Sequence, residues 1–181
     1  MVVRVNTPIH MAAVRGFHSK MFQEVKRKMD NKRWFLKGMR DGIPISTGYF
    51  AVSLTLGIAA RKAGISALEA TVMSFAMHAS AGQFAAMELI ASGAGYLEMI
   101  MTEIVVNLRY VLMSCALSQK IRRDIPFLHR FFVAYDVTDE IFGISISVDG
   151  KLNPWYTYGA MAVASPGWVG GTLLGALLGN V

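Results

Sequence analysis

Two polar residues stand in the middle of a long apolar run of this 181-residue chain. Asn107 and Arg109 lie inside IVVNLRYVLMSCAL, where a helix would keep both far from either end. A guanidinium in such a place cannot easily reach water, so Arg109 needs an anionic partner. A structural ion pair and an anionic substrate group both fit this need. The two coexist if the substrate competes for the pair.

A second group of polar residues is acidic. Asp136, Asp139 and Glu140 stand at i, i+3 and i+4 in DVTDEIFGIS, a spacing that predicts three carboxylates on one face of a helix. Like charges this close together favour holding a proton, or binding an ammonium group or another cation. A solvated helix on a membrane surface is the alternative interpretation. The apolar flanks FLHRFFVAY and IFGISIS argue against it.

A third group interrupts SFAMHASAGQFAAMELIA, residues 74–91, with His78, Ser80, Gly82 and Gln83. The small residues 79–82 could break the helix and leave N–H and C=O groups free. Such a break is tolerated in an apolar environment only where it is buried or lines a cavity. An unbroken helix that uses small residues for close packing fits equally well. His78 suits a proton relay, although a histidine with one ordinary hydrogen-bond partner is commoner.

The composition shows which solvent surrounds these residues. The chain is 54% hydrophobic and 17% charged, whereas soluble domains carry about 25% charged residues. Residues 42–60 and 152–181 hold no charge, and a 19-residue helix spans roughly 30 Å, the thickness of a bilayer core. Ten of the 18 Lys and Arg residues precede residue 41. We therefore predict an integral membrane protein with a basic arm on the cytoplasmic side, and no nucleic-acid partner.

The predicted fold class is all-α, a polytopic helix bundle, because in lipid each segment must satisfy its own backbone hydrogen bonds. Residues 1–33 are predicted to be a basic cytoplasmic arm, either disordered or upstream of the true start, and residues 34–181 the transmembrane domain. Short loops separate about five apolar segments: 42–60, 66–91, 96–118, 127–148 and 156–179.

Charge also predicts the topology. If all five segments cross the membrane, the basic loop 119–126 lies outside, against the positive-inside rule. If the second segment instead turns back at residues 79–82, that loop returns to the cytoplasm with the arm. At the other end of the chain, four glycines at a spacing of four predict close packing of another helix: Gly167, Gly171, Gly175 and Gly179.

Four stretches, in order, resemble the AzlC family of branched-chain amino acid permeases: FLKGMRDGIPISTGYF, SFAMHASAGQFAAMELI, IVVNLRYVLMSCALS and DVTDEIFGIS. The resemblance covers about residues 34–179. It implies export of branched-chain or related amino acids across the bacterial cytoplasmic membrane, together with a small hydrophobic membrane partner of the AzlD type. Family members usually continue beyond residue 181. A C-terminally truncated member is therefore expected, with its glycine stripe lacking the helices that would cover it.

The leading hypothesis is a transporter subunit that binds an amino-acid zwitterion. Arg109 with Asn107, or a half-helix N-terminus near Gly82, would bind the carboxylate. The predicted substrate-binding residues are Ser80, Gly82, Gln83, Asn107, Arg109, Asp136, Asp139 and Glu140, with His78 and Asp139 as a proton relay. A non-transporting membrane scaffold or assembly subunit is the alternative. The chain lacks HExxH, GxSxG and GxxxxGK, so neither an enzyme nor a cofactor or metal site is expected.

Overall fold

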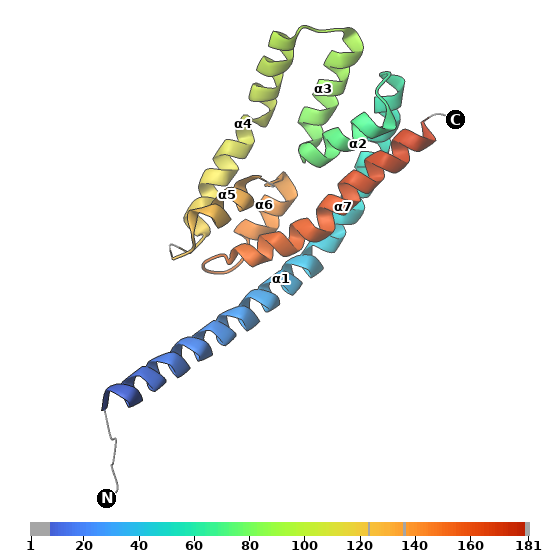
Figure 1. The fold of residues 1–181 in the computed structure, drawn as a ribbon. Helices are drawn as coiled ribbons and strands as arrows, with labels where there is room; N and C mark the ends of the chain where they lie inside the picture. Colours follow the sequence, from blue (N-terminus) through green and yellow to red (C-terminus); the bar gives the residue numbers. More distant parts are fainter. Residues whose placement is uncertain (1–7, 123, 136, 180–181) are drawn as a thin grey trace, which may run out of the picture.

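The computed structural model describes residues 8–122, 124–135 and 137–179, with side chains from residue 29 onward. This part of the chain is almost entirely helical (Figure 1). The helices are α1 (Pro8–Lys62), α2 (Ala67–Ala76), α3 (Ser80–Ser92), α4 (Tyr96–Lys120), α5 (Phe127–Tyr135), α6 (Asp139–Ile146) and α7 (Pro154–Leu178). The all-α fold class is confirmed.

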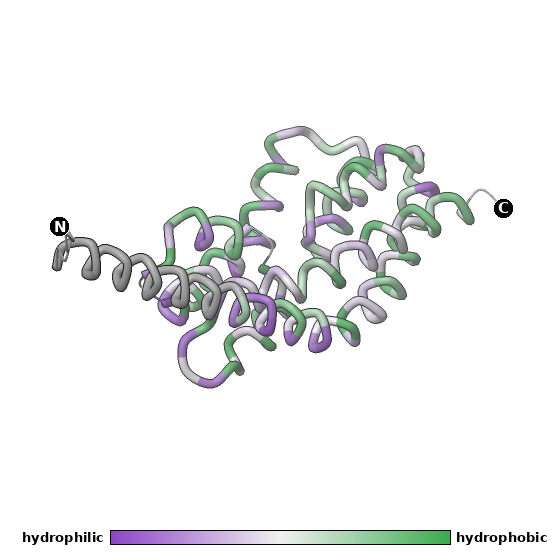
Figure 2. Tube along the Cα trace, turned by 60° about the horizontal axis from the view of Figure 1, so that its bottom comes forward, coloured by the Kyte–Doolittle hydropathy of each residue, from purple (hydrophilic) through white to green (hydrophobic). Residues whose placement is uncertain are grey.

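Among the described residues, three helices are long and apolar enough to cross a membrane. They are α4, α7 and the Met29–Lys62 part of α1. Hydrophobic residues cover much of these helices (Figure 2). The expected count of about five crossing segments is not confirmed, because the second and fourth segments each break into two short helices.

The second segment folds as the pair α2 and α3. Ser66 and Glu69 form a capping box at the start of α2, and the chain is extended at Met77 and again at Ala79 before α3 begins. The Gln83 Nε2 atom donates to Ser74 Oγ at 2.6 Å, across the break. The two helices therefore run back along each other (Figure 1). The predicted break is confirmed, and the pair has the re-entrant form.

The fourth segment also breaks, between α5 and α6. Arg130 of α5 donates to the Ser118 carbonyl at 2.7 Å, and Lys120 donates to the Ile146 carbonyl at the end of α6. Both ends of this pair thus lie beside the C-terminal end of α4, and its break lies deeper in the bundle (Figure 1). The expectation of one continuous helix over 127–148 is wrong. Thr138 caps a new helix there by accepting from Ile141 N–H at 3.3 Å.

The long helices alternate in direction. The Asn153 amide beside the start of α7 donates to Asn31 of α1 at 2.9 Å, and Leu152 N–H donates to the Lys120 carbonyl at 3.0 Å. The C-terminal end of α4 therefore lies with the N-terminal ends of the other two spans. This end of the bundle, called the basic end below, carries residues 29–33, the loop 119–126 and the loop 147–153. Loop and arm share one end, as the topology prediction requires.

Glycines let α1 and α7 pack in parallel with almost no separation. A Cβ atom at Gly175 would lie 2.0 Å from the Leu54 carbonyl oxygen, and one at Gly159 would lie 2.0 Å from the Phe35 carbonyl oxygen. Main-chain atoms cannot move aside, so only glycine allows this approach. The glycine stripe of α7 is thus occupied by α1 of the same chain. The interpretation of the stripe as an uncovered groove is wrong.

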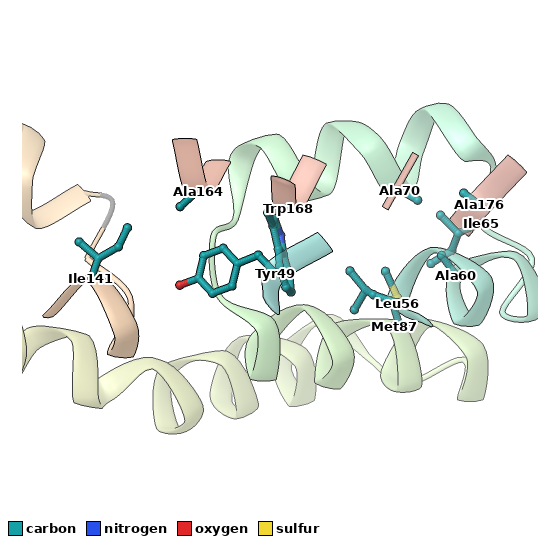
Figure 3. Close-up of a cluster of buried hydrophobic side chains, with 10 residues drawn as sticks. All are labelled: Tyr49, Leu56, Ala60, Ile65, Ala70, Met87, Ile141, Ala164, Trp168 and Ala176. Carbon is teal, nitrogen blue, oxygen red and sulfur yellow. The ribbon is translucent and has the colours of Figure 1, made fainter. Parts of the chain in front are cut away.

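One buried cluster joins the spans to the first broken pair. Tyr49 of α1 and Trp168 of α7 meet edge to face with 5.6 Å between ring centroids. Met87 of α3 and Ile141 of α6 belong to the same cluster. In Figure 3 the Tyr49 hydroxyl points away from the aliphatic side chains and toward the side where Ile141 lies. The ring thus connects the apolar core to the α5–α6 break.

Candidate functional site

The breaks of the two helix pairs lie close together, between the long helices. A small cavity between them is lined by residues of α1, α3, α4, α6 and α7 and of the two breaks: Tyr49, His78, Ser80, Tyr110, Thr138, Asp139, Glu140 and Trp168. Most of these side chains are polar, although the cavity lies midway along three apolar helices. Two helix N-termini, at Ser80 and Asp139, begin here, and each directs unpaired N–H groups toward it.

Arg109 of α4 is paired with Asp139, the first residue of α6. The Nη1 to Oδ2 distance is 2.8 Å, and the two side chains are 42% and 47% exposed. The other terminal nitrogen of Arg109 donates to the Tyr110 hydroxyl at 3.2 Å. The predicted anionic partner of Arg109 is therefore Asp139. Because both groups remain half exposed, a ligand can reach the pair.

The second carboxylate of α6 has a different partner. The Tyr49 hydroxyl lies 2.6 Å from the Glu140 Oε2 atom and also contacts the Thr138 hydroxyl, which caps α6. Asp139 and Glu140 thus face two different long helices. The prediction that the carboxylates share one helical face is wrong, because the helix begins at Asp139. Asp136, the third member of the predicted group, lies outside the described residues.

Gln83 is placed one turn into α3, in a buried polar network. Its Nε2 atom donates to Ser74 at 2.6 Å, and its Oε1 atom accepts from the Trp168 indole at 3.2 Å. Ser74 donates in turn to Thr172 at 2.7 Å. Gln83, Ser74 and Thr172 are fully buried. This network ties α2, α3 and α7 together, and Gln83 does not line the cavity.

Asn107 and Gly82 meet at a separate contact beside the cavity. The Asn107 amide donates to Glu103 Oε2 at 2.7 Å on the same helix. A Cβ atom at Gly82 would lie 2.8 Å from that Glu103 oxygen and 2.9 Å from Asn107 Nδ2. Glycine at this position allows α3 to touch α4. Of the predicted residues, His78, Ser80, Asp139 and Glu140 line the cavity and Arg109 borders it, whereas Gly82, Gln83 and Asn107 surround it.

Sequence reasoning missed four lining residues: Tyr49, Tyr110, Thr138 and Trp168. A signal existed for Thr138. A threonine followed by Asp and Glu is a typical helix start, because the hydroxyl caps the helix and the acids favour its N-terminal dipole. No local pattern marks Tyr49 or Trp168. Their roles arise from the packing of α1 against α7.

The cavity itself is small, about 10 Å³, room for roughly one water molecule. A larger ligand therefore enters only if the Arg109–Asp139 pair or the Tyr49–Glu140 contact opens. The surrounding groups can match a zwitterion: a guanidinium and two helix N-termini for an anion, and two carboxylates for a cation. Among the described residues, no cluster of three His, Cys, Asp or Glu side chains could hold a metal ion.

Comparison with known proteins agrees with this arrangement. The sequence profile of a family described as AzlC protein matches residues 44–181. A membrane protein of Archaeoglobus fulgidus, named as uncharacterized, is 34% identical over 146 residues, which cover 81% of this chain and 63% of the relative. No solved structure matches the chain.

Two further relatives carry more specific names. The inner membrane protein YgaZ of Escherichia coli is 27% identical over 150 residues, covering 81% of this chain and 61% of that protein. The branched-chain amino acid transport protein AzlC of Bacillus subtilis is 22% identical over 141 residues, covering 76% and 55%. The chain therefore spans less than two thirds of the length of these curated relatives.

Proposed function

Because this membrane protein belongs to the AzlC family, we propose that it is a transporter subunit that exports branched-chain or related small apolar amino acids. The observation that carries the proposal is the half-exposed Arg109–Asp139 pair between two helix breaks. Charges at this depth are costly in lipid, and polar groups that converge on one cavity are typical of substrate sites in transporters.

In the proposed bound state the substrate replaces the ion pair. Its carboxylate binds Arg109 and the N-terminal turn of α3 at Ser80. Its ammonium group binds Asp139, with Glu140 as the second carboxylate. This exchange keeps every charge paired, which favours binding without leaving an isolated ion at mid-depth. Tyr49 holds Glu140 in place through the 2.6 Å contact.

The side chain of the substrate would lie against apolar groups beside the cavity. Trp168 lines it, and Tyr110 from α4 adds a second ring. Apolar walls of this kind favour aliphatic over charged amino acids because a second charge on the substrate would remain unpaired. We propose His78 and Asp139 as the groups that pass a proton during the cycle, since both line the same cavity.

We also propose that a small hydrophobic membrane subunit of the AzlD type covers the α4 side of the site. Large apolar side chains along α4 are exposed, among them Ile104, Val105, Leu108 and Leu112. Lipid can cover these, but it cannot cover the half-exposed ion pair beside them. A protein surface there would keep hydrocarbon away from Arg109. The proposed location is the cytoplasmic membrane of a bacterium.

The test is counterflow in proteoliposomes. Vesicles preloaded with unlabelled leucine should accumulate labelled leucine, and Arg109→Gln should abolish this while the protein still inserts. Asp124→Asn, which changes a carboxylate in the loop at the basic end, is the matched control and should transport normally. Absence of counterflow both alone and with the small partner would favour the non-transporting scaffold instead.

A further inference from the structure

The helices repeat with a fixed interval. The spans α1, α4 and α7 end at Lys62, Lys120 and Leu178, each 58 residues after the last. α4 and α7 also begin 58 residues apart, at Tyr96 and Pro154. Between successive spans lies one broken pair, α2–α3 or α5–α6. A span followed by a broken pair is therefore a unit that occurs twice, and α7 begins in the register of a third.

The two units point in opposite directions across the membrane. α1 runs away from the basic end and α4 runs toward it, because Leu152 beside Lys120 lies next to the Asn153–Asn31 contact. The pair α2–α3 accordingly starts and ends at the far end of the bundle, and α5–α6 starts and ends at the basic end (Figure 1). This is an inverted-topology repeat, in which a pseudo-twofold axis lies in the membrane plane.

Side-chain contacts obey the same relation. Tyr49 of α1 touches Glu140 of α6. Moving each position by 58 residues in opposite directions gives Asn107 of α4 and Gly82 of α3, which also lie against each other. The break sequences agree as well, since Ala76, Ser80 and Phe84 correspond to Ala134, Thr138 and Phe142. The α1–α6 and α4–α3 interfaces are thus equivalent positions in the two units.

These equivalent interfaces have different shapes in this structure. Between α1, α6 and the start of α7 lies a cleft of about 430 Å³ near the basic end, lined by Lys37, Asp41, Gly143, Ile144, Ser147, Val148 and Tyr156. A Cβ atom at Gly143 would meet nothing within 4 Å. At the other interface, by contrast, a Cβ atom at Gly82 would clash with Glu103 and Asn107. One interface is open and the other closed.

We propose that Gly82 and Gly143 are the gate residues of an alternating-access cycle, in which the α4–α3 and α1–α6 interfaces open and close in turn. This rests on the proposed transport function. The charged residues Lys37 and Asp41 in the α1–α6 cleft keep it wet, and it ends one helical turn of α6 short of Glu140. The structure is the state open toward the basic end. The exchanged state closes α6 onto α1 and separates α3 from α4.

The test uses cysteine reporters at equivalent positions in a Cys115→Ser background, which removes the one native cysteine. Ile144 lines the open cleft, and its equivalent Ala86 on α3 is 4% exposed. An impermeant thiol reagent in reconstituted vesicles should label Ile144→Cys and spare Ala86→Cys. Adding Gly82→Val should reverse the preference, with a roughly tenfold shift in the ratio of the two labelling rates.

Gly48→Val is the matched control, because a Cβ atom there meets nothing within 4 Å. It should leave both labelling rates unchanged. Gly143→Leu should hold the open state and keep Ala86→Cys protected even when leucine is present, and it needs no rearrangement to fold. Gly82→Ala serves if the valine variant does not insert.

The inference is overturned if Gly82→Val inserts normally and leaves the labelling ratio unchanged, or if it increases labelling at both reporters together. Labelling needs no substrate. Reciprocal labelling without leucine counterflow would therefore refute the proposed substrate and keep the gates, whereas counterflow without reciprocal labelling would do the opposite.

Discussion

Removing either member of the Arg109–Asp139 pair should impair transport through one shared interaction. The two atoms lie 2.8 Å apart, which allows strong coupling, but the side chains are 42% and 47% exposed. Fully exposed pairs couple by about 0.2–1 kcal/mol, and contacting residues within one network by about 0.5–3 kcal/mol. We expect a value between these, about 1–2 kcal/mol, which corresponds to a factor of roughly 5–30.

The assay is the initial rate of leucine counterflow, normalised to the amount of protein inserted. Asp139→Asn and Arg109→Gln should each reduce the rate strongly, because each leaves the other group without its partner and removes one ligand of the substrate. The double variant should then be roughly 5–30-fold more active than the product of the two single losses predicts. Membrane insertion should fall much less than transport.

A second pair in the same chain provides the control cycle. Arg122 and Asp124 are joined by two hydrogen bonds, of 3.0 and 2.7 Å, in the loop at the basic end, and are 53% and 63% exposed. The Arg122 guanidinium holds the pKa of Asp124 below its ordinary value. Neutralising either should leave counterflow unchanged. Additive losses at Arg109 and Asp139, within about 0.5 kcal/mol, would place the two groups in separate sites and refute the shared-site reasoning.

Three further predictions concern the fold around the site. Gly175→Val should destabilise the detergent-solubilised protein by more than about 1–3 kcal/mol, because its Cβ meets the Leu54 carbonyl at 2.0 Å, whereas Gly170→Val meets nothing and should leave the thermal midpoint unchanged. Gln83→Leu should lower thermal stability by about 1–3 kcal/mol for each buried partner it leaves unsatisfied; a normal midpoint with altered substrate affinity would instead restore the sequence-based role of Gln83. In a cysteine-free background, an impermeant reagent added to intact cells should label Ser92→Cys and spare Asp149→Cys, and the reverse pattern would overturn the topology.

The sequence predicts the class of the fold because lipid leaves few choices. Uncharged runs of bilayer length and a basic arm are sufficient to indicate a helical membrane protein. The break near Ser80 is also predictable, since small residues and a polar cluster occur together in an apolar run. The break before Asp139 escaped notice because a spacing of i, i+3 and i+4 is compatible with a continuous helix. Only the capping role of Thr138 distinguishes the two.

The candidate site could be predicted only in part, for a physical reason. A charge in an apolar segment reports its own need for a partner, and so Arg109 and Asp139 were found. An uncharged side chain reports no such need. Tyr49 could pack anywhere along α1, and its contact with Glu140 depends on the parallel packing of α1 and α7. The same packing explains why the glycine stripe indicated a missing partner, although α1 already occupies it.

The 58-residue interval connects these observations. A broken pair that does not cross the membrane adds no crossing to its unit, so each unit crosses once and the next unit must be inverted. Inversion brings a break from each side to the same depth, and two helix N-termini therefore meet where neither could be solvated alone. The polar residues that seemed costly in the sequence become mutually satisfying there: Arg109 of the second unit pairs with Asp139, and Tyr49 of the first unit reaches Glu140. The inverted repeat thus accounts both for where the site lies and for why its groups come from opposite ends of the chain.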